Sequence, residues 1–140
     1  MTPYGSSTGT GYVLEQMVLP ALKKGGYSYQ QQQRVGERPN GRRHIVDVLA
    51  QKDAAKLLIS MKWQEVSGTA EHKVPFEVMC LADAVRAGYG TRGVLVLGGD
   101  GWSLREYFVS GKLREHLIHA DLVSVIKLEH FVKQANRGLL

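Results

Sequence analysis

Two neighbouring segments of this 140-residue chain alternate between apolar and polar residues. His44–Gln51 and Lys56–Gln64 each show the two-residue period of a β-strand that buries one side. A turn near residues 52–55 joins them, so the pattern predicts a hairpin. In the first strand, Ile45, Asp47 and Leu49 are expected to share a side. Polar side chains are predicted to converge on one surface of this hairpin: Asp47, Ser60, Lys62 and Gln64.

The remaining pattern predicts helices and strands on both sides of the hairpin. Before it come a glycine-rich lead-in (4–11), a helix (12–24) that kinks or restarts at Pro20, and a polar edge strand (27–35). After it come a helix (75–87) with Pro75 in its first turn, a buried strand (93–97), a helix (103–117), a strand (122–126) and a helix (128–136).

The length and composition of the chain predict one basic domain. The length suits a single domain spanning 1–140, and the net charge of +5 with a pI near 9.4 favours a polyanionic partner. The single cysteine, Cys80, is expected to be a buried thiol in a reducing compartment. The start of the chain lacks the pattern of a signal peptide, and no segment is long enough to span a bilayer, so a cytoplasmic protein without membrane contact is expected.

The hairpin residues resemble the PD-(D/E)XK nuclease superfamily. That family's motif has an Asp on the second strand of a meander and an acid-x-Lys triplet on the third. Here Asp47 and the triplet Ser60-Met61-Lys62 occupy these places, with Val46 at the motif's Pro and Ser60 at its acid. The resemblance implies an α/β, restriction-endonuclease-like fold, with an αβββαβ core and a mixed central sheet flanked by helices.

The resemblance also implies a metal site. The catalytic candidates are Glu15, Asp47, Ser60, Lys62, Gln64 and Glu71. Mg²⁺, with Mn²⁺ as a substitute, would be held by Asp47, Glu71 and the backbone carbonyl of Met61. In relatives with a Ser-x-Lys triplet the acid lies on the following helix, and Glu77 is the alternative to Glu71. A carboxylate midway along an apolar strand, as at Asp47, independently calls for a partner.

Basic and amide side chains near the hairpin are candidates for DNA contacts. Phosphate neutralisation needs cations, and amides can read base edges. The candidates are Gln31, Gln33, Arg34, Arg38, Arg42, Arg43 and Lys73. The glutamine run is equally explained as an edge strand that resists aggregation. The five histidines lack metal-ligand spacing and are expected at the surface or beside the site.

The resemblance therefore predicts a Mg²⁺-dependent DNA endonuclease acting on double-stranded or branched DNA inside the cell, as a nucleoid-associated or phage-encoded protein. A site-specific homing or restriction-like enzyme is the first interpretation. A Holliday-junction resolvase or another structure-specific nuclease is the alternative, and a non-catalytic DNA-binding module with the same fold is a further one. Because a small domain cuts one strand, double-strand cleavage would require a homodimer or homotetramer.

Overall fold

The computed structural model describes residues 10–140, so residues 4–9 of the predicted lead-in lie outside the described part. The strands are β1 (Ser28–Glu37), β2 (Arg43–Lys52), β3 (Ala55–Trp63), β4 (Arg92–Gly98) and β5 (Val123–Lys127). The α-helices are α2 (Thr10–Val13), α3 (Leu19–Lys24), α4 (Ala70–Arg86), α5 (Arg105–Val109) and α6 (Leu128–Asn136). A π-helix, η1 (Leu14–Val18), and two 3₁₀ turns, η2 (Lys112–Glu115) and η3 (Ala120–Leu122), complete the described elements.

The five strands form one mixed sheet in the order β1-β2-β3-β4-β5. β1, β2 and β3 pair antiparallel, whereas β3, β4 and β5 pair parallel through crossovers that contain helices. The predicted hairpin is confirmed, with Asp53 and Ala54 between β2 and β3. The polar first strand lies at the sheet edge as predicted, and the α/β class with a mixed central sheet is confirmed.

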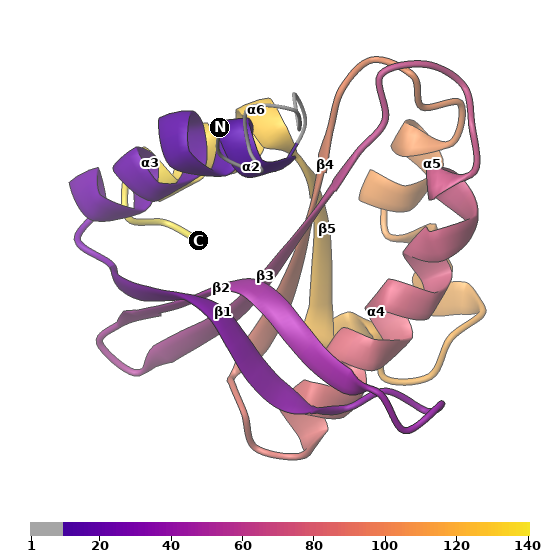
Figure 1. The fold of residues 1–140 in the computed structure, drawn as a ribbon, viewed down its shortest axis with the longest axis horizontal. Helices are drawn as coiled ribbons and strands as arrows, with labels where there is room; N and C mark the ends of the chain where they lie inside the picture. Colours follow the sequence, from indigo (N-terminus) through magenta and orange to yellow (C-terminus); the bar gives the residue numbers. More distant parts are fainter. Residues whose placement is uncertain (1–9) are drawn as a thin grey trace.

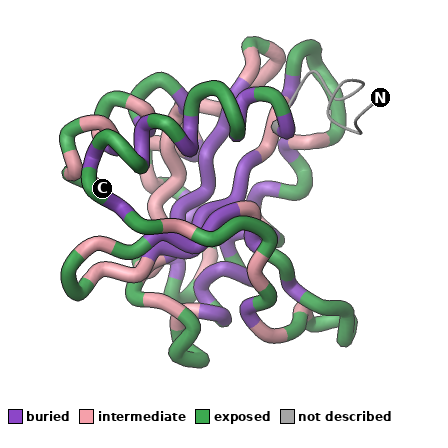
Figure 2. Tube along the Cα trace, turned by 60° about the vertical axis from the view of Figure 1, so that its left-hand side comes forward, coloured by how far each residue is buried: buried purple, intermediate pink, exposed green. Residues whose placement is uncertain are grey.

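Helices cover both faces of the sheet (Figure 1). On one face α2, η1, α3 and α6 bury alternate residues of β3, including Ile59 and Met61. On the other face α4 and α5 pack over the intervening residues, including Leu58, and over Leu95 of β4. Buried residues lie both along the central strands and in the helices that cover them (Figure 2). Because β4 is covered by helices on both faces of the sheet, successive residues along it are buried, which explains its continuous aliphatic run.

Pro20 restarts the first helix, as its position predicts. It occupies the first turn of α3, directly after the π-helical turn η1. Proline cannot donate the backbone hydrogen bond that a continuous α-helix needs, and the wider π turn absorbs that interruption. The helix therefore continues in direction and buries Leu14, Val18 and Leu22 against the sheet.

Two predicted helix bounds are wrong. α4 begins at Ala70, so Pro75 lies inside the helix and not in its first turn. The missing N–H of Pro75 faces the carbonyl of Glu71, near enough to the helix start to be tolerated. The predicted helix 103–117 is divided at Gly111, whose φ of 85° favours glycine and interrupts an α-helix.

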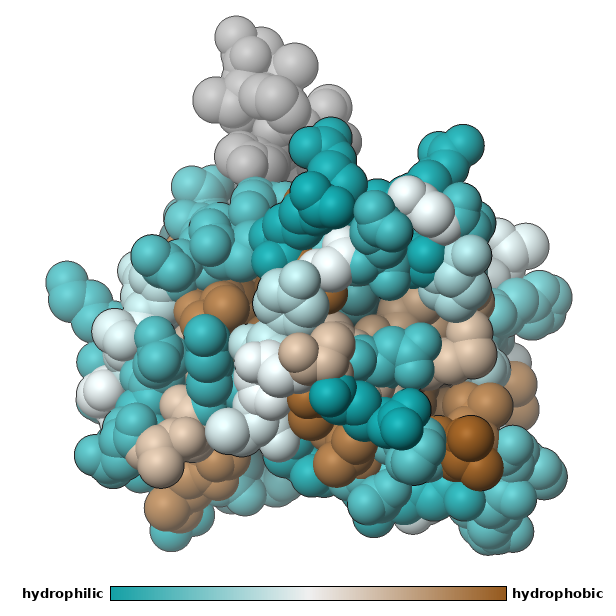
Figure 3. Space-filling model, turned by 90° about the horizontal axis from the view of Figure 1, so that it is seen from below, coloured by the Kyte–Doolittle hydropathy of each residue, from teal (hydrophilic) through white to brown (hydrophobic). Residues whose placement is uncertain are grey.

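Hydrophilic side chains predominate on the face shown in Figure 3, where they separate the hydrophobic areas from one another. Within residues 10–140, no helix has the length and apolar character needed to cross a membrane.

Candidate active site

The ladder between β2 and β3 ends just before Asp47. Its last pair is Val48 with Ile59, and a continued ladder would next bond Met61 to Val46. The backbone N–H of Met61 instead donates to Oδ2 of Asp47 at 2.8 Å. The side chain of Asp47 thus takes the place of a ladder acceptor at the point where β2 and β3 diverge, and its half-buried carboxylate lies in the fork between them.

The edge strand bends at the same level. Gln32, opposite Asp47, has a φ of 53°, a left-handed conformation that is costly for a residue other than glycine. Val48 packs under α3, whereas Val46 packs under α4, so β2 changes the face that it buries at Asp47. The expectation that Ile45, Asp47 and Leu49 share one side is therefore wrong: Ile45 is exposed, and Leu49 is buried in the core under α4.

Helix α4 brings a second carboxylate to this region. Glu77, which is 4% exposed, accepts hydrogen bonds from both terminal nitrogens of Arg38, at 2.7 and 3.3 Å. Nζ of Lys62 lies 4.0 Å from Oε2 of the same carboxylate. We call Arg38, Asp47, Lys62 and Glu77 the carboxylate cluster. It joins side chains from the β1–β2 loop, both strands of the predicted hairpin and α4.

The two carboxylates of the cluster have opposite electrostatic surroundings. Burial raises the pKa of Asp47, and the negative charge of Glu77 raises it further, against the opposing effects of the Met61 N–H and Lys62. Burial alone would raise the pKa of Glu77 too, but the hydrogen bonds of Arg38 and the charges of Lys62 and Arg38 hold it below its usual value. Glu77 is therefore the firmly ionised member of the pair.

The sequence predicts the histidines at the surface or beside the site, and His44 lies beside the carboxylate cluster, close enough for its charge to act on Glu77. Its burial was not predicted: it is 1% exposed, and its Nε2 has no hydrogen-bond partner among the described residues. Burial, together with the positive charges of Arg38 and Lys62, lowers the pKa of the imidazole. The signal was its position two residues before the buried Val46 on the same strand.

Gln64 and Glu71 belong to a separate buried network. The side chain of Gln64 donates to the Gly101 carbonyl at 2.8 Å and accepts from the backbone N–H of Ala70 at 3.0 Å, at the start of α4. The Glu71 carboxylate accepts from the Ser103 hydroxyl at 2.7 Å and from the backbone N–H groups of Ser103 and Leu104. Although burial would raise the pKa of Glu71, these bonds lower it. Both residues thus tie the β4–α5 loop to α4.

The other predicted catalytic residues have different surroundings. Ser60 is 4% exposed on β3, on the same side of the strand as Lys62. The side chain of Met61 packs into the core on the opposite face of the sheet, and its backbone N–H contacts Asp47 in the fork. Glu15 is exposed on η1, which covers the sheet face opposite α4. Among the described residues, Glu15 forms no hydrogen bond or ion pair with a member of the carboxylate cluster.

The candidate DNA-contacting residues fall into two groups. Arg42 and Arg43 are exposed beside a shallow hollow that is also lined by Gly41 and Ile45. Arg38, in contrast, is engaged by Glu77 and lies over the Phe76 ring at 5.9 Å.

The remaining candidates lie farther along β1 and on α4. Gln31 is exposed, and the amide of Gln33 donates to the carbonyl of Gln31. Arg34 pairs with Glu37 at 3.5 Å, and Lys73 is exposed on α4.

The carboxylate cluster fits a hard divalent cation. Within residues 10–140, no group of three or more His, Cys, Asp or Glu side chains is arranged to hold a metal ion. Mg²⁺ needs only one or two carboxylates, with water and substrate oxygens completing its shell. Asp47 and Glu77 supply two, and a bound cation would favour the ionised form of Asp47, whose pKa is raised mainly by burial and further by the charge of Glu77.

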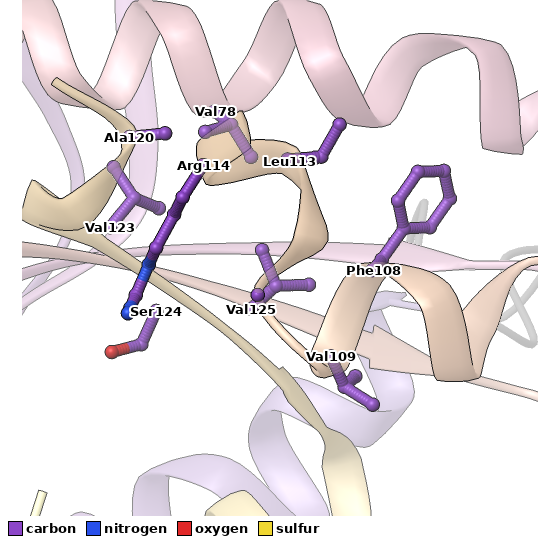
Figure 4. Close-up of a pocket in the computed structure, with 10 residues that line it drawn as sticks. Val78, Phe108, Val109, Leu113, Arg114, Ala120, Val123, Ser124 and Val125 are labelled. Atoms are coloured by element: carbon purple, nitrogen blue, oxygen red, sulfur yellow. The ribbon is translucent and has the colours of Figure 1, made fainter. Parts of the chain in front are cut away.

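A well-formed cavity lies elsewhere in the molecule. It has a volume of about 170 Å³ and is lined mainly by apolar side chains from α4, the α5–β5 region and β5 (Figure 4). Arg114 extends along it beside Ser124. Since it contains no carboxylate and none of the cluster residues, it is separate from the candidate active site.

No curated protein matches this chain in sequence. A crystal structure described as a protein of unknown function, AF1548, is 14% identical to the chain, with a TM-score of 0.49, over 81% of this chain. The chain spans 55% of the length of that protein.

A protein-family model for the PD-(D/E)XK nuclease superfamily domain matches residues 6–139, nearly the whole chain. Nucleases of this superfamily act on DNA and generally use divalent metal ions. The fork between β2 and β3, with Asp47 on one strand and Lys62 on the other, is where the resemblance located the motif. The chain belongs to the PD-(D/E)XK nuclease superfamily.

Proposed function

We propose that this protein is a metal-dependent DNA endonuclease whose centre is formed by Asp47, Lys62, Glu77 and the backbone carbonyl of Met61. The observation that carries the proposal is the carboxylate cluster. Two acids and a lysine from three separate elements meet where β2 leaves β3. Removing charged side chains from water costs free energy, and such groups with perturbed pKa values are concentrated at functional sites.

Each residue of the centre has a chemical role. A bound Mg²⁺ or Mn²⁺ would polarise the scissile phosphate and lower the pKa of a water molecule. Asp47 and Glu77 would hold the cation, and Asp47 is fixed for this by the Met61 N–H. Lys62 is half-exposed and can orient the attacking water or stabilise charge on the phosphate.

We assign the acid of the motif to Glu77 and not to Glu71. Glu77 lies 4.0 Å from Lys62, and its charge acts on Asp47. Glu71 uses its carboxylate to bind the backbone of Ser103 and Leu104. Ser60, buried and neutral, cannot supply the missing charge, so a helix-borne acid is needed to complete a pair of ligands.

The β1–β2 loop is the proposed DNA contact. Arg42 in this loop and Arg43 at the start of β2 are exposed and would neutralise phosphates, while the exposed Gln31 on the edge strand could reach base edges. A site-specific enzyme of the homing or restriction type would use this loop in a groove. A junction resolvase would use it on the backbone of branched DNA. Either enzyme would cut two strands as a homodimer or homotetramer.

The test is cleavage of a supercoiled plasmid and a four-way junction, side by side, with Mg²⁺. Lys62→Ala is expected to lower the cleavage rate by about 100-fold or more, because it removes a group that stabilises the transition state. Lys133→Ala is the matched control: it removes the same charge from an exposed position on α6, on the opposite face of the sheet, and is expected to cleave like the unmodified protein.

Discrete plasmid fragments would establish a site-specific endonuclease, and symmetric nicks confined to the junction would establish a resolvase. Binding of DNA without any cleavage, in Mg²⁺ and in Mn²⁺, would contradict the proposal and favour a non-catalytic DNA-binding module.

A further inference from the structure

Arg38 holds the carboxylate that the proposed metal site needs. Its two terminal nitrogens bond to the two oxygens of Glu77, at 2.7 and 3.3 Å, across 39 residues of sequence. Nζ of Lys62 approaches one of these oxygens at 4.0 Å. Both oxygens are therefore engaged by cations, and a metal ion that binds Glu77 has to compete with a bidentate, charge-assisted contact.

The origin of Arg38 makes this contact sensitive to DNA. Arg38 begins the tight β1–β2 loop, where its N–H donates to the Arg42 carbonyl and its own carbonyl accepts from Gly41. Arg42, in the same loop, and Arg43, at the start of β2, are exposed, whereas the Arg38 side chain is 21% exposed. A phosphate bound by these exposed arginines would therefore be held at the loop that carries Arg38.

A phosphate is a chemical equivalent of the carboxylate that Arg38 now holds. A guanidinium binds phosphate and carboxylate in the same bidentate geometry. Transfer of Arg38 from Glu77 to a phosphate would keep the charge of the guanidinium neutralised. It would leave Lys62 as the one ion-pair partner of Glu77 among the described residues. The same step would convert Glu77 from an occupied acceptor to an available ligand.

We propose that Arg38 is a positioning residue that couples DNA binding to metal binding. In the free protein it occupies Glu77, and a DNA phosphate draws it away and completes the metal site. The inference rests on the proposed function, since it assumes that Asp47 and Glu77 bind the cation. Because coupling between two ligands is reciprocal, metal and DNA must each tighten the binding of the other by the same factor.

The test uses the full chain and measures binding, not cleavage. Mn²⁺ affinity of the DNA-free protein is measured by the electron paramagnetic resonance of free Mn²⁺. Arg38→Ala is expected to bind Mn²⁺ at least about fivefold more tightly than the unmodified protein, within the usual range of coupling between sites. Arg38→Lys, which keeps the charge but cannot bond to both oxygens, should lie between the two. Arg137→Ala is the control: it removes the same charge from an exposed position at the end of α6, on the sheet face opposite α4, and its Mn²⁺ affinity should be unchanged.

The reciprocal measurement is DNA affinity by fluorescence anisotropy, with and without Ca²⁺. Ca²⁺ should tighten DNA binding of the unmodified protein and of Arg137→Ala, and should do so much less in Arg38→Ala. If Arg38 serves only to fasten the loop to α4, Arg38→Ala and Arg38→Lys will melt at lower temperature with no gain in Mn²⁺ affinity, and the coupling is refuted.

Failure of the inference is distinct from failure of the proposed function. If the unmodified protein binds Mn²⁺ equally well with and without DNA, and Asp47→Asn no longer binds it, the coupling is overturned but the metal site is retained. Binding of Mn²⁺ that is the same in Asp47→Asn and the unmodified protein, with and without DNA, would overturn both.

Discussion

Glu71 and Glu77 lie on the same helix, six residues apart, and both are nearly buried. Glu71 binds backbone N–H groups of the β4–α5 loop, whereas Glu77 binds Arg38 and lies near Lys62. At 1.5 Å per residue the two positions are about 9 Å apart along the axis, on different sides of the helix. One acid therefore holds a loop in place, and the other faces the fork.

Exchange of each acid for its amide separates these roles. Glu77→Gln is expected to abolish most Mn²⁺ binding and to lower cleavage by about 100-fold or more, because it removes one of two charged ligands. Glu71→Gln is expected to lower the free energy of unfolding by about 1–3 kcal/mol, since it weakens bonds to a charged acceptor. Urea unfolding and Mn²⁺ titration of both variants provide the check. A metal-binding defect confined to Glu71→Gln would restore Glu71 as the acid of the motif.

The same contacts fix a pH dependence at the residue scale. The pKa of Glu77 is lowered in the folded protein, so its ion pair stabilises the fold above the carboxylate's usual range, and that stability is lost as pH falls through the lowered pKa. The pKa of Asp47 is raised, so its ionised form costs stability once pH exceeds the value in the unfolded chain. A loss of stability at neutral pH from one ionised side chain, such as Asp47, is typical of functional sites.

At the scale of elements, the glycine-rich turn after β4 supports the start of α4. The sequence predicts Gly98 to Gly101 to be a turn without a phosphate-binding role, and the structure packs it against the chain that leaves β3. Gly99 has a φ of 89°, and a Cβ on it would lie 2.4 Å from the Gln64 carbonyl oxygen. Gln64 in turn bonds to Gly101 and Ala70. The turn, the end of β3 and the helix N-terminus thus form one unit.

Gly99→Ala tests this unit. The new methyl group meets backbone atoms that cannot move easily, and alanine resists a positive φ, so a loss of about 1–3 kcal/mol in the free energy of unfolding is expected. Gly41→Ala is the matched control, because Gly41 also has a positive φ but has no atom within 4 Å of the added Cβ. Thermal melting should show a larger loss for Gly99→Ala. Equal losses would mean that backbone conformation, and not the contact with Gln64, sets the cost.

At the scale of the whole molecule, positive charge is the property that the fold directs toward DNA. The net charge of +5 is distributed over the chain, but Arg42 in the β1–β2 loop and Arg43 at the start of β2 are neighbours and both exposed. Arg38 in the same loop is paired with Glu77. In the free protein, Arg42 and Arg43 are therefore more accessible to phosphate than Arg38 is.

Salt dependence measures that number. Binding of a short duplex is followed by anisotropy at several KCl concentrations, and the slope of log affinity against log salt counts the phosphates neutralised. Arg42→Ala should reduce the slope by about one, as should Arg43→Ala. Lys133→Ala on α6 should leave it unchanged. A slope that none of the loop variants alters would exclude this loop as the DNA contact.

The sequence pattern predicts the order of elements, the hairpin of β2 and β3, and the placement of Asp47 and Lys62 on adjacent strands, and the structure confirms them. These follow from local periodicity and turn chemistry, which act over a few residues. The pattern does not predict the start of α4 at Ala70 or the break at Gly111. Whether a helix accommodates a proline near its start, or ends at a glycine with a positive φ, depends on the tertiary contacts around that residue.

Three features are visible only in the folded structure: Glu77 is the acid near Lys62, His44 is buried, and Arg38 binds Glu77. Each of these depends on how α4 is rotated against the sheet and how the β1–β2 loop folds back onto it, across 39 residues in the case of Arg38 and Glu77. Such contacts are fixed by side-chain packing between distant segments, and a linear pattern of apolar and polar positions contains no record of that packing.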